Sequence, residues 1–289
     1  LNVLAGIERS TLVQVGLIAV ITGLATISVV VGVKGGVRRL SQANLILAGL
    51  LFAFVFIAGP TVTILETFTA TLGRYVQSLP GATLRVDFNG ENDWRSSWTL
   101  FYWGWWISWS PFVAIFLARV SKGRTIGATV VTALIVPAMA TFAWLAVFGG
   151  AGLHVERFGA GLPDTIVDEP ALALHALLDT LPFAPVTMAL ATLVILLFFV
   201  SSSDSGSLVD DMVTSGGDPH PPRIQRVFWA VSEGAVAIAL LLAGGLTAIR
   251  NAAISLGLPM SIVLALASAA IIKIMLVEGR RAKRIATPD

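Results

Sequence analysis

Cysteine is absent from the 289 residues, and only three histidines occur. Without cysteine the chain has no disulfide framework and no thiolate zinc site. The histidines, His154, His175 and His220, are not paired at the helical spacing of metal ligands, so we expect no metalloenzyme. Charged residues make up only 12% of the chain, whereas soluble domains carry about 25%. So few charges suit a protein whose flanks are covered by lipid.

Several function classes find little support in the sequence. The chain lacks the Walker-type glycine-rich loop that cradles nucleotide phosphates, which argues against a built-in ATP motor. A membrane enzyme needs titratable groups that converge at membrane depth, and the apolar runs offer little besides Glu233. A channel filter needs charged rings or repeated carbonyl loops, and none is evident. An enzyme or a channel with an aromatic-lined site inside the membrane stays the alternative to a carrier.

Long apolar runs are what the sequence has instead, since 56% of its residues are hydrophobic. A spanning helix needs about 20 mostly apolar residues. The fifth run leads into the polar segment 201–205, where we expect the helix to end. The pattern predicts an all-α polytopic membrane protein with seven spans, at residues 12–33, 42–62, 97–118, 126–149, 182–203, 224–247 and 253–276.

The connections between these runs alternate between basic and acidic. If all seven spans are real, the two kinds of connection fall on opposite sides of the membrane. The positive-inside rule then predicts a cell-membrane protein whose basic tail, 278–289, is cytoplasmic. The basic residues are Lys34, Arg38, Arg39, Arg119, Lys122, Arg124, Arg223, Arg226, Arg280, Arg281, Lys283 and Arg284.

Residues 61–79 follow another pattern. Apolar residues recur there at helical spacing, with Glu66, Arg74 and Gln77 among them, and Gly59 and Pro60 precede the segment. This pattern predicts an amphipathic connector helix at the outer membrane interface. A surface helix lying over the body of the protein is an equally physical interpretation.

The third run, at residues 97–118, is rich in tryptophan. Tyr102, Trp105 and Trp109 are spaced at three or four residues, which puts them on one stripe of a helix, and Trp106 lies next to that stripe. These tryptophans fall near the middle of the span, too deep for an interfacial aromatic belt. The spacing alone leaves aromatic core packing and a ligand site both open.

Indole rings at membrane depth suit one kind of ligand best. A ring face attracts a cation, and tryptophan does so most strongly. A quaternary ammonium group donates no hydrogen bonds, so it loses little when ring faces replace water. This chemistry favours a methylated ammonium ligand over a sugar or an inorganic anion.

The run FYWGWWISWSPF at 101–112, within 98–119, resembles the signature of the betaine/carnitine/choline transporter family. Weaker matches follow the same order at 59–60, 121–126, 147–150 and 198–205. The resemblance implies an inverted-repeat (LeuT-like) transporter fold, of which this chain resembles the last seven helices. We therefore expect that the front of the transporter, with the other aromatics of the substrate box, is missing before Leu1.

The family resemblance also implies a function. It implies a secondary transporter that imports choline, glycine betaine or carnitine as a compatible solute by alternating access, coupled to sodium or protons. It implies no catalysis and no nucleic acid partner, but contact with membrane lipid and a homotrimer. The substrate-binding residues that it implies are Tyr102, Trp105, Trp106 and Trp109.

The serine-rich end of the fifth run matches family positions that supply oxygens to a sodium ion. The resemblance implies Phe198, Ser201 and Ser202 as ion-binding residues, together with Phe112. A bound sodium ion would need a facing helix that this chain lacks. The alternative is that the serine hydroxyls bond back to the preceding turn. We interpret Asp204 as a helix cap and part of a gate near the cytoplasmic end rather than as a buried ion ligand.

Glu233 falls about ten residues into the sixth span. An ionisable residue at that depth predicts either a part in proton coupling or a hydrogen bond to a neighbouring helix. The sequence alone gives it no partner. Gly104, between the tryptophans, is expected to loosen its helix locally, because glycine costs about 1 kcal/mol in a helix interior.

Overall fold

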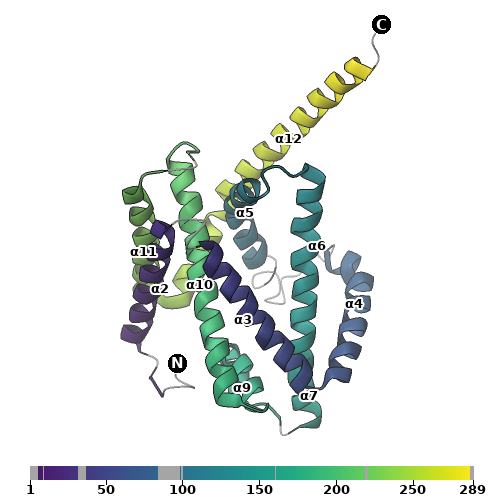
Figure 1. Cartoon of the computed structure of the whole chain (residues 1–289), viewed down its shortest axis with the longest axis vertical. Coiled ribbons are helices and arrows are strands. Elements are labelled where there is room, and N and C mark those ends of the chain that lie inside the picture. The colour runs from purple at the N-terminus through teal and green to yellow at the C-terminus, as the bar shows by residue number, and fades with distance from the viewer. Residues whose placement is uncertain are drawn as a thin grey trace, which may run out of the picture. The chain divides into compact units, whose positions relative to one another are not determined.

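The computed structural model describes residues 6–8, 10–31, 37–83, 98, 100–159, 161–218 and 221–286 (Figure 1). Every regular element in these ranges is a helix, which confirms the prediction of an all-α polytopic protein. The long helices are α2 (Thr11–Val31), α3 (Val37–Ala58), α4 (Thr61–Thr83), α5 (Phe101–Val120), α6 (Ile126–Trp144), α10 (Ala184–Thr214), α11 (Arg223–Ser255) and α12 (Gly257–Ala286). The short elements are η2 (Leu145–Gly149), α7 (Gly150–Phe158), α8 (Thr165–Asp168), η3 (Pro170–Leu172) and α9 (Ala173–Asp179).

Each of the seven predicted spans contains one long helix. By length and hydropathy, five segments of the described residues are able to cross a membrane, and the last of them combines α11 with α12. Helix α5 is not among the five, because its tryptophans, tyrosine and serines lower its hydropathy. The five segments are Thr11–Ser28, Arg38–Ala58, Ile126–Phe158, Ala184–Thr214 and Arg223–Gly279.

Two predicted span ends are wrong. Helix α10 does not end in the segment 201–205 but continues to Thr214. The serine hydroxyls there bond to carbonyls one turn back, which lets these polar residues stay in the helix. The fourth span continues beyond residue 149, because the π-helical turn η2 leads directly into α7.

The described residues form two compact units. Unit 1 comprises Leu1–Arg85 and Gly123–Ala235, and unit 2 comprises Val86–Lys122 and Val236–Asp289. Helix α11 contributes to both, and its backbone departs from helical geometry at Gly244 and Gly245. A single transmembrane domain over 1–289 stays a prediction.

Unit 1 has an apolar core between α3, α4, α7, α9 and α10. Its most buried side chains are Leu51, Val55, Ile64, Ala151 and Leu178, each at most 1% exposed. Helix α10 packs along both α3 and α2. This packing holds α10, and with it the serine-rich segment, in a fixed position within the unit.

Helix α4 covers the predicted amphipathic segment 61–79 and extends to Thr83. It buries Ile64 in the core, and Tyr75 contacts the ring of Phe142 on α6 with centroids 5.0 Å apart. Most of its other side chains are exposed or half-buried. Its place at the outer membrane interface stays a prediction.

Helices α2 and α11 approach each other closely at Gly234. A Cβ atom built on Gly234 would overlap the side chain of Thr22, whose own Cβ would lie 2.9 Å from it. Only glycine allows this approach. Polar groups on α2, α10 and α11 are thereby brought within reach of one another.

Candidate functional site

Helix α5 in unit 2 carries the predicted substrate-binding residues. Tyr102, Trp105, Trp106 and Trp109 are 39%, 42%, 53% and 49% exposed. Within the described residues they are therefore not core packing, and half of each ring surface is free for contact with a ligand, with lipid or with another part of a transporter. Their role in substrate binding stays a prediction.

The rings of α5 form a continuous row along the helix, the aromatic ladder. Phe101 and Trp105 are stacked at 6.2 Å, Trp105 and Trp106 are tilted by 49° at 6.0 Å, and Trp106 meets Trp109 edge-on at 5.9 Å. At the start of the helix, Trp98 stacks on Tyr102 at 5.2 Å. Because the ring planes tilt, their faces point in several directions, which suits a rounded cation better than a flat ligand.

A single helix presents this ladder as an open arc rather than as a closed cage. A cage around an ammonium group needs aromatic faces from more than one side. The geometry of α5 thus supplies one wall of such a site.

Close packing against the end of α11 and the start of α12 holds α5 in place. Ser108 is 8% exposed, and its hydroxyl donates to the carbonyl oxygen of Ala253 at 2.8 Å. The backbone of Gly104 lies against Ile254 and Gly257, and a Cβ on Gly257 would come within 3.0 Å of the Gly104 oxygen. The expectation that Gly104 loosens the helix is wrong, because α5 is continuous there and glycine serves close packing.

The sequence interpretation missed one residue of this face. Arg250, on α11, places its guanidinium carbon 5.3 Å from the centroid of the Phe101 ring. The signal was present in the sequence, since Arg250 is the only cationic residue between Arg226 and Lys273.

The predicted sodium ligands Phe198, Ser201 and Ser202 lie on α10 in unit 1. The Ser201 hydroxyl donates to the carbonyl oxygen of Phe198 at 3.1 Å, as the alternative interpretation expected. The Ser205 hydroxyl donates in the same way to the Ser201 carbonyl at 2.9 Å. The hydroxyl of Ser201 keeps its lone pairs, so it is still able to accept a cation. Phe112, assigned to the same ion site, lies on α5 in unit 2.

Asn44 on α3, which the sequence interpretation missed, reaches the same turn of α10. Its side chain is only 2% exposed. In the orientation that satisfies both of its polar ends, the amide nitrogen donates to the Val194 carbonyl and the amide oxygen accepts from the Phe198 N–H, each at 3.3 Å. This amide ties α3 to the turn that leads into the serine-rich segment.

The interpretation of Asp204 as a cap is wrong. Asp204 lies inside α10, is fully buried, and accepts a hydrogen bond from the hydroxyl of Ser28 on α2. A cap would stand at a helix end, ten residues further along at Thr214. The carboxyl group instead joins α10 to α2, because a buried polar group is stabilised by a hydrogen-bond partner.

Glu233 finds partners on α10. The hydroxyl of Ser203 donates to its carboxyl group at 3.3 Å, and the Asp210 carboxyl group is in hydrogen-bonding contact with it. These contacts support helix pairing between α10 and α11. A part in proton coupling stays a prediction.

A buried ion pair is formed by Asp211, the residue after Asp210. Arg226 of α11 places Nε 3.3 Å from a carboxylate oxygen of Asp211, whose side chain is fully buried. Gln225 adds a hydrogen bond from its side-chain nitrogen to the backbone oxygen of Asp211 at 3.1 Å. Together with Ser28, Ser203, Asp204, Asp210 and Glu233, these residues form the polar cluster of unit 1.

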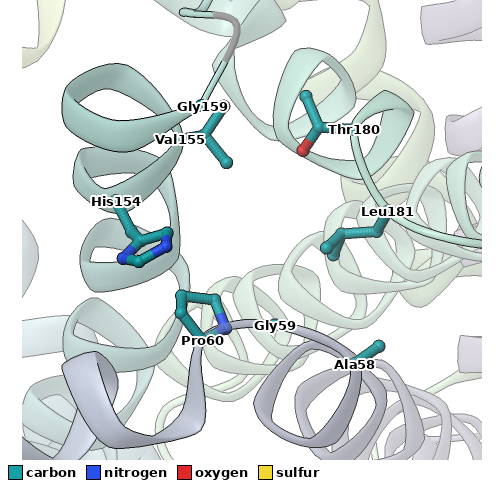
Figure 2. A pocket seen from close by; sticks show the side chains of 8 residues that line it. All are labelled: Ala58, Gly59, Pro60, His154, Val155, Gly159, Thr180 and Leu181. Atoms are coloured by element: carbon teal, nitrogen blue, oxygen red, sulfur yellow. The ribbon is translucent and has the colours of Figure 1, made fainter.

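A pocket of unit 1 lies apart from all predicted site residues. Its volume is about 550 Å³, and it is lined by Ala58, Gly59, Pro60, His154, Val155, Gly159, Thr180 and Leu181. Figure 2 shows His154 and Val155 on one side of this space and Thr180 and Leu181 on the other. His154 is held by a hydrogen bond between its Nδ1 and the Thr63 hydroxyl at 3.2 Å.

The part of the chain that the structure describes contains no group of three or more histidine, aspartate or glutamate side chains arranged to hold a metal ion. His175, on the short helix α9, bonds Thr192 at 2.9 Å instead, and burial lowers the pKa of its imidazole.

The aromatic ladder and the helical architecture agree with a comparison to known proteins. The model of the betaine/carnitine/choline family transporters matches residues 1–280. The chain belongs to this family. The family consists of transporters, not enzymes, and its membership confirms the resemblance seen in the sequence.

Curated relatives cover the whole chain. A glycine betaine/proline/choline transporter of Vibrio parahaemolyticus is 42% identical over 100% of this chain and 52% of its own length. A glycine betaine transporter of Bacillus subtilis is 40% identical over 98% and 56%. An osmo-dependent choline transporter of Acinetobacter baylyi is 39% identical over 97% and 42%. The chain thus spans about half the length of the curated relatives it matches.

Proposed function

We propose that this chain is part of a secondary active transporter that imports a quaternary-ammonium compatible solute, choline or glycine betaine, with carnitine as a third candidate. The observation that carries the proposal is the aromatic ladder. Trp105, Trp106 and Trp109 present half-exposed indoles in the first half of α5, near the middle of the predicted span 97–118, where few other ligands would compensate the loss of water. The names of the relatives support the same substrate class.

The mechanism we propose is alternating access, in which helical repeats move around a substrate held within the membrane. The chain supplies one aromatic wall, and the rest of the substrate box comes from helices outside it. Sodium or protons provide the driving force. The oxygens at Phe198, Ser201 and Ser202 are arguments for sodium as the coupling ion. The carboxyl groups of Asp210 and Glu233 are arguments for proton coupling. Membrane lipid and two further copies of the transporter are its proposed partners, with the C-terminus in the cytoplasm.

Uptake by a complete transporter that contains this chain tests the proposal. The protein is placed in proteoliposomes, and sodium and proton gradients are imposed one at a time. We expect saturable uptake of labelled choline or glycine betaine that stops when one of these gradients is collapsed. Uptake of neither solute with either gradient, by protein shown to be folded, would contradict the proposal. Ion conductance without saturation would indicate a channel instead.

A further inference from the structure

Arg250 of α11 lies beside the aromatic ladder, and the proposed function gives it no role. Its guanidinium carbon lies 5.3 Å from the centroid of Phe101, the ring that stacks on Trp105. Its side chain is exposed. Within the described ranges, no acidic side chain forms an ion pair with it. A charge that faces a proposed binding wall without a counter-ion is available to a ligand.

Helix packing fixes the position of Arg250 relative to the ladder. Three residues after it along α11, the carbonyl oxygen of Ala253 accepts the hydroxyl hydrogen bond of Ser108. One residue later, Ile254 lies against Gly104, where a Cβ would come within 3.0 Å of its Cγ2. The guanidinium group is therefore placed by the close contact of two helices, not by a flexible loop. Such pre-organisation lowers the cost of binding.

The combination of a guanidinium group and ring faces discriminates between ligands by charge. The rings attract an ammonium group, whereas the positive charge beside them opposes a ligand whose only charge is positive. A zwitterion satisfies both groups. Its ammonium group lies against the rings, and its carboxylate accepts two parallel hydrogen bonds from the guanidinium fork.

The distances suit a short zwitterion. Trp105 lies one ring from Phe101, at 6.2 Å, and Trp106 lies one ring further, at 6.0 Å. In glycine betaine a single methylene separates the ammonium nitrogen from the carboxylate carbon. An ammonium group against Trp105, the ring next to Phe101, thus leaves the carboxylate near the guanidinium group that lies over Phe101.

We propose that Arg250 binds the carboxylate of a zwitterionic quaternary-ammonium solute and so favours betaine-type solutes over choline. This inference rests on the proposed function and narrows its substrate class. Choline carries a neutral hydroxyl group in place of the carboxylate, so it gains little from Arg250 and is opposed by its charge.

The test compares two solutes in the same complete transporter. Arg250→Gln removes the charge, and Arg250→Lys keeps the charge but loses the planar fork. Lys273→Gln on α12 is the matched control, because it removes a cation from the same unit away from the ladder. The KM for glycine betaine and the KM for choline are measured for each variant.

We expect Arg250→Gln to raise the KM for glycine betaine about 10- to 100-fold, the range of a charge-assisted hydrogen bond. The KM for choline should stay unchanged or fall, which also shows that the variant is folded. The KM of Arg250→Lys for glycine betaine should lie between the values of the unmodified protein and of Arg250→Gln. Lys273→Gln should change the KM for neither solute. An equal change for both solutes, or no change for either, would overturn the inference. Failure of the unmodified protein to transport both solutes would overturn the proposed function instead.

Discussion

The two units of this chain place their unusual side chains in opposite ways. In unit 1, polar groups of α10 are buried or half-buried and paired with other helices: Asp204 with Ser28, Asp211 with Arg226, and Ser203 with Glu233. In unit 2, the rings of α5 are half-exposed and contact mainly other rings of their own helix. Buried pairs hold helices together, whereas exposed rings are left for a partner or a ligand.

The difference has a physical cause. A carboxylate or guanidinium group inside the protein is costly unless it is paired, so each such group of unit 1 restricts how its helix packs. Moving an indole from water into an apolar environment costs much less free energy than moving a charged group. A cation that binds to the ring face is then stabilised by it. We therefore expect substitutions in the polar cluster to change stability, and substitutions in the aromatic ladder to change transport.

The largest expected effect is that of Arg226→Gln. Removing the guanidinium group breaks the ion pair between Arg226 and the buried Asp211, and breaking a buried pair typically costs about 3–5 kcal/mol of unfolding free energy. Thermal or denaturant unfolding in detergent measures the loss. Arg223→Gln is the control, because Arg223 is exposed on the first turn of the same helix and should cost less than about 0.5 kcal/mol. Equal stability of the two variants would remove the polar cluster as a source of stability.

Gly234→Ala should have the second largest effect. The added Cβ would overlap the Thr22 side chain where α2 meets α11, and overpacking of this kind costs about 1–3 kcal/mol. Gly16→Ala on α2 is the matched control, because a Cβ there meets no atom within 4 Å. That control should gain up to about 1 kcal/mol from the higher helix propensity of alanine. The same unfolding assay applies, and a stable Gly234→Ala variant would show that α2 and α11 do not meet at this glycine.

Trp106→Ala tests the aromatic ladder of unit 2, where substitutions are expected to change transport rather than stability. Trp106 is 53% exposed and contacts the rings of Trp105 and Trp109, so its removal should change unfolding free energy little. Transport should weaken by about 1–2 kcal/mol, or roughly tenfold in KM for choline or glycine betaine. Trp103→Ala is the control, since Trp103 is 65% exposed and lies outside the ring contacts of the ladder. Unchanged uptake kinetics in Trp106→Ala would refute the substrate assignment, and a large loss of stability would refute the contrast between the units.

The smallest expected effect concerns pH and belongs to unit 1, because the residue ranges of unit 2 contain no histidine. Burial lowers the pKa of His175 in the folded state, so unfolding takes up a proton once the pH falls below the ordinary histidine value of about 6.5. The stability that the neutral imidazole contributes is therefore fully present above that value and declines below it. His175→Gln should flatten the fall in unfolding temperature between about pH 7.5 and 5.5. An identical pH profile in the two proteins would show that His175 does not contribute.

Several features could be predicted from the sequence because they depend on residues close together in the chain. The apolar runs predicted seven of the eight long helices, and the amphipathic pattern of residues 61–79 predicted the eighth, α4. The spacing of Trp105, Trp106 and Trp109 placed them on one side of α5. The predicted end of α10 was wrong, because the polar residues at 201–205 look like a helix terminus. In the structure the hydroxyls of Ser201 and Ser205 donate to carbonyl oxygens of the preceding turn, so the helix continues. No local pattern distinguishes these two outcomes for serine.

The amino-acid sequence by itself determined the helices, their apolar faces, the aromatic ladder and the family, since each of these follows from composition and short-range periodicity. The tertiary structure decided which polar residues are paired. Asp204 meets Ser28 across 176 residues of sequence, and Arg250 reaches Phe101 from a different helix. Such pairs depend on how distant helices pack, and packing is set by the shapes of both surfaces together, as at Gly234 and Gly104.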